Sequence, residues 1–209
     1  YEIMPSLVGS EMCIRDRAVN CLIYWGSSAL TAGRYHFDFT MAFDREVPLL
    51  PVFVWFYILA FPFWAVGYLL AARRGKDMFY RFVATDLTIH FICFICFILI
   101  PTTNIRPEIP GNTLSEKILA LVYSLDGGNS PSNLFPSIHC YVSWMCWKGV
   151  EGSEKVPKWY QRFSLVFAIL IIISTQVLKQ HYIVDAAAAL LLVEFFWRFY
   201  QKGQRHKWV

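Results

Sequence analysis

The sequence predicts an all-α, polytopic membrane protein with six transmembrane helices and a short amphipathic surface helix between the third and fourth spans. Two observations favour this fold class. Hydrophobic residues make up 56% of the 209 residues and charged residues only 16%, which is too apolar for an ordinary soluble protein. The charged residues also gather between long apolar blocks, as loops do between membrane spans. The net charge of +4 is too small and scattered to indicate a nucleic-acid partner.

The first seventeen residues, YEIMPSLVGSEMCIRDR, do not fit this pattern. They resemble translated sequencing-adapter read-through, of which MCIRDR is the recognisable core, so we expect residues 1–17 to be a non-native leader. Residues 18–209 then form a single membrane domain. Its first span is predicted from Ala18 to about Gly33, shorter than the usual length of about 20 residues.

The second span is predicted over Val47–Ala72, where three prolines interrupt the run in a way that membrane helices tolerate. A basic turn leads to a third span over Phe79–Ile100. This span carries Asp86 and His90 one helical turn apart. We expect the pair to be a buried tie to a neighbouring helix, with a proton relay as the alternative.

The connection from Pro101 to Phe135 is polar and long, which is typical of functional loops. Within it, Thr113 and Glu116 have the spacing of a capping box. Apolar residues then recur at helical spacing up to Leu125, which predicts the amphipathic surface helix. The remaining spans are predicted at Leu134–Val150, Phe163–Leu178 and Tyr182–Tyr200.

Basic residues divide unequally between the two membrane faces of this topology. Twelve lie in the turns of one face: Arg73, Arg74, Lys76, Arg81, Lys148, Lys155, Lys158, Arg162, Arg198, Lys202, Arg205 and Lys207. Five lie on the other: Arg34, Arg45, Arg106, Lys117 and Lys179. The positive-inside rule therefore places the second face outside the cytoplasm.

Six polar residues lie at the membrane crossings of that outer face: Arg106, Ser137, His139, Lys179, His181 and Asp185. His181 and Asp185 are four residues apart, so on a helix the carboxylate can lie behind the imidazole. Such a carboxylate fixes the tautomer and makes the other ring nitrogen a better base or nucleophile. His139 can then serve as a separate acid for a leaving group.

The other members of the set suit a phosphate. Arg106 offers a planar fork that matches phosphate oxygens, and Lys179 adds a second cation. Ser137 lies at an expected helix N-terminus, where backbone N–H groups attract anions. We therefore predict phosphoryl transfer at the outer membrane surface. No acidic cluster indicates a metal, and we expect no cofactor. For each histidine alone, the alternative is a hydrogen-bonded interfacial side chain.

From about residue 18 to its end, the chain resembles the type 2 phosphatidic acid phosphatase superfamily. The resemblance rests on Arg106-Pro107, on the stretch Pro136-Ser137-Ile138-His139, and on Ser174 followed by His181 and Asp185. It implies that His181 is a nucleophile forming a phosphohistidine and that Asp185 orients it. It further implies that His139 protonates the leaving alcohol and that Arg106 and Ser137 bind phosphate.

Three positions depart from the superfamily motifs: Leu99 replaces a lysine, Ile138 a glycine and Thr175 an arginine. Lys179 is our candidate to replace one lost cation. The stretches PSIH and KQHYIVD also resemble the branch of inositol phosphorylceramide and sphingomyelin synthases, which pass a phosphoryl head group to an alcohol.

The leading hypothesis is a bacterial inner-membrane lipid phosphatase acting on a lipid phosphate or pyrophosphate. A lipid phosphotransferase is the enzymatic alternative, and a membrane transporter is the non-enzymatic one. A transporter should place its ionisable groups near mid-membrane rather than at one end. The lipid and the oligomeric state stay open.

Overall fold

The computed structural model describes residues 26–128 and 131–205, with side chains through residue 201. Residues 26–31 are helical. The elements that follow are β1 (Phe37–Asp38), α2 (Ala42–Glu46), the 3-10 helix η1 (Pro51–Phe53), α3 (Val54–Ala72), α4 (Lys76–Leu99), β2 (Thr102–Thr103), α5 (Leu114–Leu125), α6 (Ile138–Val150), α7 (Lys158–Val177) and α8 (Ile183–Arg205). The mostly helical architecture matches the predicted class.

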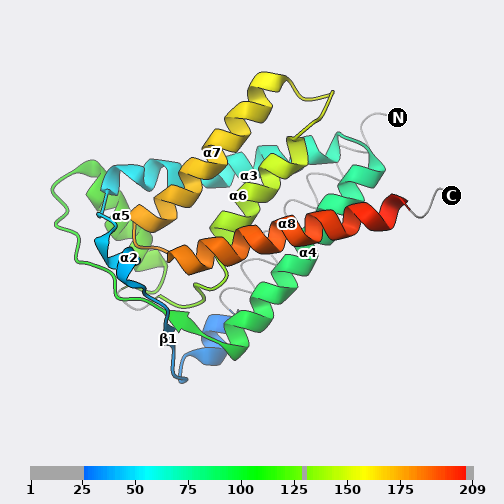
Figure 1. Cartoon of the computed structure of the whole chain (residues 1–209). Coiled ribbons are helices and arrows are strands. Elements are labelled where there is room, and N and C mark those ends of the chain that lie inside the picture. Colours follow the sequence, from blue (N-terminus) through cyan, green and yellow to red (C-terminus); the bar gives the residue numbers. More distant parts are fainter. Residues whose placement is uncertain (1–25, 129–130, 206–209) are drawn as a thin grey trace.

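Helix α6 is the centre of the bundle, with contacts to α3, α4, α7 and α8 (Figure 1). Buried side chains from these five helices form the main hydrophobic core. Close approach of α3 to α6 depends on Gly67, because a Cβ there would lie 2.5 Å from Cys146 Sγ. A smaller cluster joins the start of α3, α5 and the end of α7.

Three segments of the described residues are long and apolar enough to cross a membrane: Pro51–Ala72, Lys76–Leu99 and Lys158–Val177. They correspond to the predicted second, third and fifth spans. Helix α6 has 13 residues, and α8 has 23 residues but carries charges at Asp185, Glu194 and Arg198. At about 1.5 Å per residue α6 spans about 20 Å, less than the ~30 Å hydrocarbon layer. Six spans are therefore not confirmed.

Several predicted boundaries shift. The fourth segment was predicted from Leu134, but α6 begins at Ile138 because Ser137 caps it by accepting a hydrogen bond from the Cys140 N–H. In the second segment, the helical stretch begins only at Pro51, a residue type suited to a first helical turn. The predicted leader and the first half of the predicted first span, Ala18–Gly33, lie outside the described residues.

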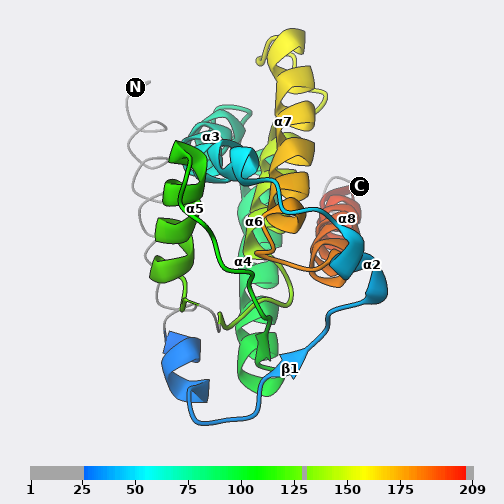
Figure 2. The ribbon, with the colours of Figure 1, turned by 90° about the vertical axis from the view of Figure 1, so that its left-hand side faces the viewer.

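The predicted capping box at α5 is confirmed, since Thr113 Oγ1 accepts from Glu116 N and Glu116 Oε2 accepts from Thr113 N. Helix α5 packs against η1 and α3 (Figure 2). Leu119 and Tyr123 are buried in this contact, whereas Leu121 and Leu125 are exposed. One side of the amphipathic helix therefore packs against the protein, and Leu121 and Leu125 lie on its exposed side.

The segment before α3 binds the rest of the chain through short polar contacts. Strand β1 pairs in parallel with β2, with Phe37 opposite Thr102. Helix α2 lies beside the start of α8 (Figure 2), where Asp44 Oδ1 accepts from Ile183 N at 2.9 Å. This segment thus supports the two elements that flank the candidate site, β2 and the start of α8.

The expected interhelical tie of the third predicted span is confirmed. His90 Nδ1 lies 3.5 Å from Asp86 Oδ1, and the Tyr141 hydroxyl of α6 lies 2.6 Å from His90 Nε2. All three side chains are buried. The pair therefore joins α4 to α6.

Candidate active site

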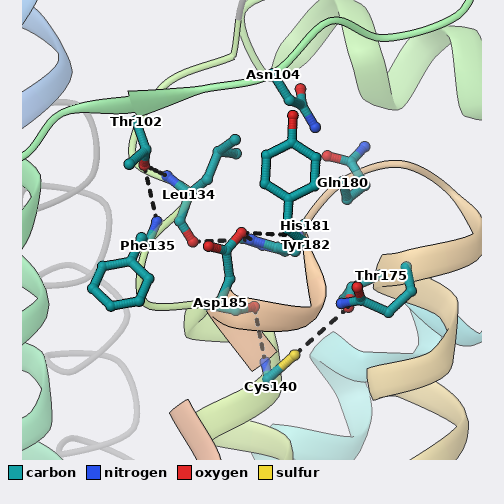
Figure 3. A network of polar contacts seen from close by, with 12 residues as sticks. Thr102, Asn104, Leu134, Phe135, Cys140, Thr175, Gln180, His181, Tyr182 and Asp185 are labelled. Carbon is teal, nitrogen blue, oxygen red and sulfur yellow. Dashed lines mark hydrogen bonds and ion pairs between the residues drawn. The ribbon is translucent and has the colours of Figure 1, made fainter. Parts of the chain in front are cut away.

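The predicted site residues come from segments that meet at one end of the bundle. The N-terminal ends of α6 and α8, the turn after α7, and the loop around β2 converge there (Figures 1 and 3). A backbone hydrogen bond from Ser137 N to Asp185 O, 3.3 Å long, joins the starts of α6 and α8 directly.

His181 is held between two hydrogen-bond acceptors. Its Nδ1 lies 3.0 Å from the Leu134 carbonyl oxygen and 3.5 Å from Asp185 Oδ2 (Figure 3). Both neighbours accept hydrogen bonds, so the neutral ring carries its proton on Nδ1 and has its lone pair on Nε2. The predicted pairing of His181 with Asp185 is present in the fold, and Leu134 adds an acceptor that the sequence did not indicate.

Asp185 has a second contact that fixes its position. Its Oδ2 accepts a hydrogen bond from Tyr182 N at 2.9 Å, as an acidic residue in the first turn of a helix commonly does. Its Oδ1 is buried without a hydrogen-bond partner. The carboxylate is thus anchored by the start of α8 while it faces the imidazole of His181.

Thr102 positions the carbonyl that holds His181. Its Oγ1 accepts hydrogen bonds from Leu134 N at 2.9 Å and from Phe135 N at 3.0 Å (Figure 3). Thr102 is buried, so these bonds are shielded from water. This role could not be predicted from sequence spacing, because Thr102 and Leu134 are 32 residues apart.

His139 lies among aromatic rings at the start of α6. It stacks on Tyr57 with ring centroids 4.2 Å apart, and the Trp64 ring is 5.0 Å away. The centroid of the His181 ring is 6.1 Å from that of His139. His139 Nε2 is buried without a hydrogen-bond partner, and no carboxylate of residues 26–128 or 131–201 forms an ion pair with this ring. The two predicted histidines are therefore adjacent, and their surroundings differ.

Arg106 is buried and already bound by protein groups. Its Nη1 donates to the carbonyls of Asp126 at 3.0 Å and Gly128 at 3.1 Å. Its Nη2 contacts Asp126 Oδ2 and Gln180 Oε1, and its guanidinium lies 4.6 Å from the centroid of the Tyr123 ring. Only Nε is buried without a partner. The arginine expected to hold phosphate therefore also ties the loop after α5 to the turn that carries His181.

Tyr123 supports the same turn. Burial raises its pKa to about 12, although the charge of Arg106 opposes this rise. The hydroxyl therefore keeps its proton at neutral pH and donates to the Leu178 carbonyl at 2.7 Å.

Lys179 reaches toward α2. Its Nζ donates to the Asp44 carbonyl at 2.6 Å and to the Val47 carbonyl, at the C-terminal end of that helix. Burial lowers the pKa of Lys179, and the nearby charge of Asp44 opposes the shift. The backbone of Lys179 is in the left-handed region, with φ of 52°, so the turn before His181 is tightly bent. In this arrangement the Lys179 ammonium binds the C-terminal end of α2.

Ser137, the remaining predicted phosphate ligand, is buried at the N-terminus of α6. Its hydroxyl accepts from Cys140 N at 3.3 Å, so it serves as the helix cap.

Five buried polar atoms without hydrogen-bond partners belong to the segments of this site: Asn104 Oδ1, Arg106 Nε, His139 Nε2, Gln180 Nε2 and Asp185 Oδ1. Buried polar atoms are normally paired, so this grouping indicates a place for water or a polar ligand. Sequence analysis missed Gln180, the residue before His181, whose side-chain amide oxygen accepts a hydrogen bond from Arg106 Nη2. Two of the five atoms, Arg106 Nε and Gln180 Nε2, are hydrogen-bond donors suited to an anion.

The described residues thus combine apolar helices long enough to cross a membrane with a polar, histidine-containing site at one end of the bundle. A family model described as PAP2 superfamily matches residues 33–197. The chain belongs to the PAP2 superfamily, whose members generally catalyse phosphoester hydrolysis or transfer. This confirms the family resemblance found in the sequence motifs. Comparison with curated proteins and with solved structures yields no significant match.

Proposed function

We propose that the protein is an integral-membrane lipid phosphatase that hydrolyses a lipid phosphomonoester or pyrophosphate through a phosphohistidine. The observation that carries the proposal is the geometry of His181. Two acceptors on Nδ1 leave the Nε2 lone pair available for attack on phosphorus, and a second histidine lies 6.1 Å away between ring centroids. His181 has a carboxylate neighbour, Asp185, which suits a nucleophile that becomes positively charged. Among the described residues His139 has no such neighbour, which suits a proton donor.

The proposed reaction has two steps. In the first, His181 Nε2 forms a bond to phosphorus and the bond to the lipid oxygen breaks. His139, which must be protonated in the complex with the phosphate, gives its proton to that oxygen, and Asp185 stabilises the positive charge on His181. In the second, water attacks phosphorus, the N–P bond breaks, and His139 takes the proton of the water. Inorganic phosphate leaves and both histidines return to their starting states.

The phosphate is proposed to bind where the unpartnered donors gather. Arg106 Nε and Gln180 Nε2 supply hydrogen bonds, and the N-terminus of α6 at Ser137 adds its partial positive charge. Lys179 was predicted to contribute a further cation. Because its ammonium holds two carbonyls of α2, we assign it to positioning the turn before His181.

The proposed location is the bacterial inner membrane, with all six predicted segments embedded and the site outside the cytoplasm. The support is the division of twelve basic residues against five between the two faces. Helix α5 lies beside the site and exposes Leu114, Leu121 and Leu125, which suits a segment resting on the lipid surface. A substrate lipid would reach the site from the same surface.

A lipid phosphotransferase is the second candidate, favoured by one observation. Thr175 stands where the superfamily motif has an arginine, and its buried hydroxyl contacts the Ile172 carbonyl at 2.7 Å. A site with fewer fixed cations differs from that of the typical hydrolase. The same intermediate would then pass the phosphoryl group to an alcohol.

One experiment tests both candidates. Purified protein is incubated with a panel of phosphatidate, phosphatidylglycerophosphate and polyprenyl pyrophosphate, with and without alcohol acceptors, and inorganic phosphate and new lipids are measured. Phosphate release that disappears in His181→Ala supports the phosphatase. A new phosphorylated product that forms only with the alcohol supports the transferase. If neither product forms from any lipid while the protein stays folded, the proposed function is wrong.

A further inference from the structure

A polar cavity lies at the opposite end of the bundle from the two histidines. Its volume is about 340 Å³, and its lining includes four basic residues and two acidic ones: Arg74, Arg81, Lys148, Arg198, Glu151 and Glu194. These residues belong to the turn between α3 and α4, to the first turns of α4, to the end of α6 and the residue after it, and to the middle and C-terminal half of α8. The ends of these helices lie on the right in Figure 1. Asp185 and Arg198 are 13 residues apart on α8, which places this cavity about 20 Å from the candidate active site.

Four of the six charged side chains in this cavity neutralise one another. Lys148 Nζ lies 2.9 Å from Glu194 Oε1 and 3.3 Å from Glu151 Oε2. Arg198 Nη2 lies 3.4 Å from Glu194 Oε2. These two cations and two carboxylates form one ion-pair network, and their net contribution to the cavity is close to zero.

Arg74 and Arg81 contribute charge that no carboxylate neutralises directly. Arg74 Nη1 donates to the Gly149 carbonyl at 3.0 Å. Arg81 donates through Nε and Nη2 to the Trp197 carbonyl, at 3.0 and 2.6 Å, and its guanidinium lies 4.0 Å from the centroid of the Trp197 ring. Within the described part of the chain, neither guanidinium has a carboxylate oxygen within 4.0 Å.

Such an arrangement is unfavourable without an anion. Arg81 is buried, and Arg74 is half-buried. Two like charges that share one cavity repel each other, and partial burial adds a desolvation penalty to each. Both guanidiniums are fixed by hydrogen bonds to backbone carbonyls, so they keep their places in the cavity wall. A phosphate group would supply the missing negative charge and several acceptors for arginine forks.

The surroundings indicate that the anion is part of a lipid. The cavity lies where apolar helices end, which is the expected depth of the head groups of a bilayer. The same turns of α4 and α8 expose the aromatic side chains of Tyr80, Phe195 and Phe199. Exposed aromatic rings at this depth are typical of the membrane interface and would contact acyl chains. A soluble anion would gain nothing from these aromatic side chains.

We propose that this cavity binds the phosphate of an anionic membrane lipid, with Arg74 and Arg81 as its ligands, at a site separate from the candidate active site. The lipid is bound and is not a substrate, because the cavity has no histidine among its lining residues. The expected ligand is a phosphodiester lipid with a net negative charge, such as phosphatidylglycerol, and not zwitterionic phosphatidylcholine.

The test compares lipid retention by the full chain in a His181→Ala background, which prevents turnover. Detergent-purified protein is titrated with phosphatidylglycerol or with phosphatidylcholine, and bound lipid is counted by native mass spectrometry. We expect Arg74→Gln to weaken phosphatidylglycerol binding by about tenfold or more, as loss of a charged hydrogen bond predicts. Arg73→Gln is the matched control, because Arg73 is adjacent, exposed and absent from the lining.

A second measurement separates binding from folding, since Arg81 also ties α4 to α8. Phosphatidylglycerol should raise the thermal unfolding midpoint of the parent and of Arg73→Gln, and should raise it much less in Arg74→Gln and Arg81→Gln. Equal binding of the two lipids, or equal loss of binding in Arg73→Gln and Arg74→Gln, would overturn the proposal. If inorganic phosphate raises the midpoint as much as phosphatidylglycerol at equal concentration, the ligand is a free anion and the lipid assignment is wrong.

Discussion

Removing the side-chain oxygen of Thr102 should disturb the candidate active site without touching any residue that would contact substrate. Thr102→Val keeps the shape of the side chain but deletes the acceptor of two backbone N–H groups, those of Leu134 and Phe135. Both donors belong to the segment whose Leu134 carbonyl holds His181 at 3.0 Å. The substitution therefore acts on His181 indirectly, through the backbone of Leu134 and Phe135.

The magnitude follows from the number of donors left unsatisfied. An unpaired buried backbone N–H costs about 1–3 kcal/mol, so two of them should lower the free energy of unfolding by about 2–6 kcal/mol if the segment stays in place. If the segment moves to recover its hydrogen bonds, the stability loss is smaller and His181 loses its acceptor. A shift of His181 of about 1 Å should then lower kcat by about 100-fold.

Phosphate release and thermal unfolding should be measured together on Thr102→Val, Thr102→Ser and Thr103→Val. Thr102→Ser keeps the hydroxyl and should retain most of both properties. Thr103→Val changes the neighbouring residue of β2, for which the described residues show no side-chain hydrogen bond. If Thr102→Val matches the parent in stability and in kcat, Thr102 does not position the segment that holds His181.

Three further substitutions test the assigned roles. Arg106→Lys should lower kcat/KM at least tenfold and the free energy of unfolding by about 2 kcal/mol, because one ammonium cannot replace the hydrogen bonds to Asp126 and Gln180. An unchanged kcat/KM would show that Arg106 is not part of the phosphate site. Lys179→Met should lower stability by about 1–3 kcal/mol, with kcat/KM falling less than about fivefold. A 100-fold loss of kcat/KM at unchanged stability would instead make Lys179 a phosphate ligand. Tyr57→Leu, which removes the ring stacked on His139, should slow a poor leaving group more than a good one; equal slowing of both would count against His139 as the acid.

The sequence predicted those parts of the site that depend on local spacing. Asp185 follows His181 by four residues, a spacing of about one helical turn, and the fold places His181 Nδ1 3.5 Å from Asp185 Oδ2 although α8 begins only at Ile183. Ser137 was predicted at a helix start, and it caps α6. Such contacts can be predicted because they join residues only three or four positions apart at the start of a helix.

The contacts of the cations could not be predicted in the same way. Arg106 and Lys179 were assigned to phosphate from their charge and their position along the chain. Which acceptors surround them depends on distant segments, since Asp126 is 20 residues from Arg106 and α2 is more than 130 residues from Lys179. The roles of Thr102 and Gln180 were missed for the same reason.

The extent of α6 also escaped prediction, because an apolar run does not reveal where the helix begins. Leu134 and Phe135 continue the apolar pattern but lie in the extended segment before the cap at Ser137. That segment is the one whose Leu134 carbonyl binds His181. The helix prediction was therefore wrong at Leu134, the residue whose carbonyl makes a contact in the candidate active site.

The central claim is that His181 is the nucleophile and His139 the proton donor. The most direct test is to incubate the parent, His181→Ala and His139→Ala with a phosphomonoester that has a good leaving group and a labelled phosphorus. The reaction is quenched within milliseconds in alkaline detergent, where a phosphohistidine survives, and the label on the protein is measured. We predict label on the parent and on His139→Ala, which needs little proton donation with this substrate, and none on His181→Ala. Label on His181→Ala that is stable to alkali and lost in acid would contradict the assignment.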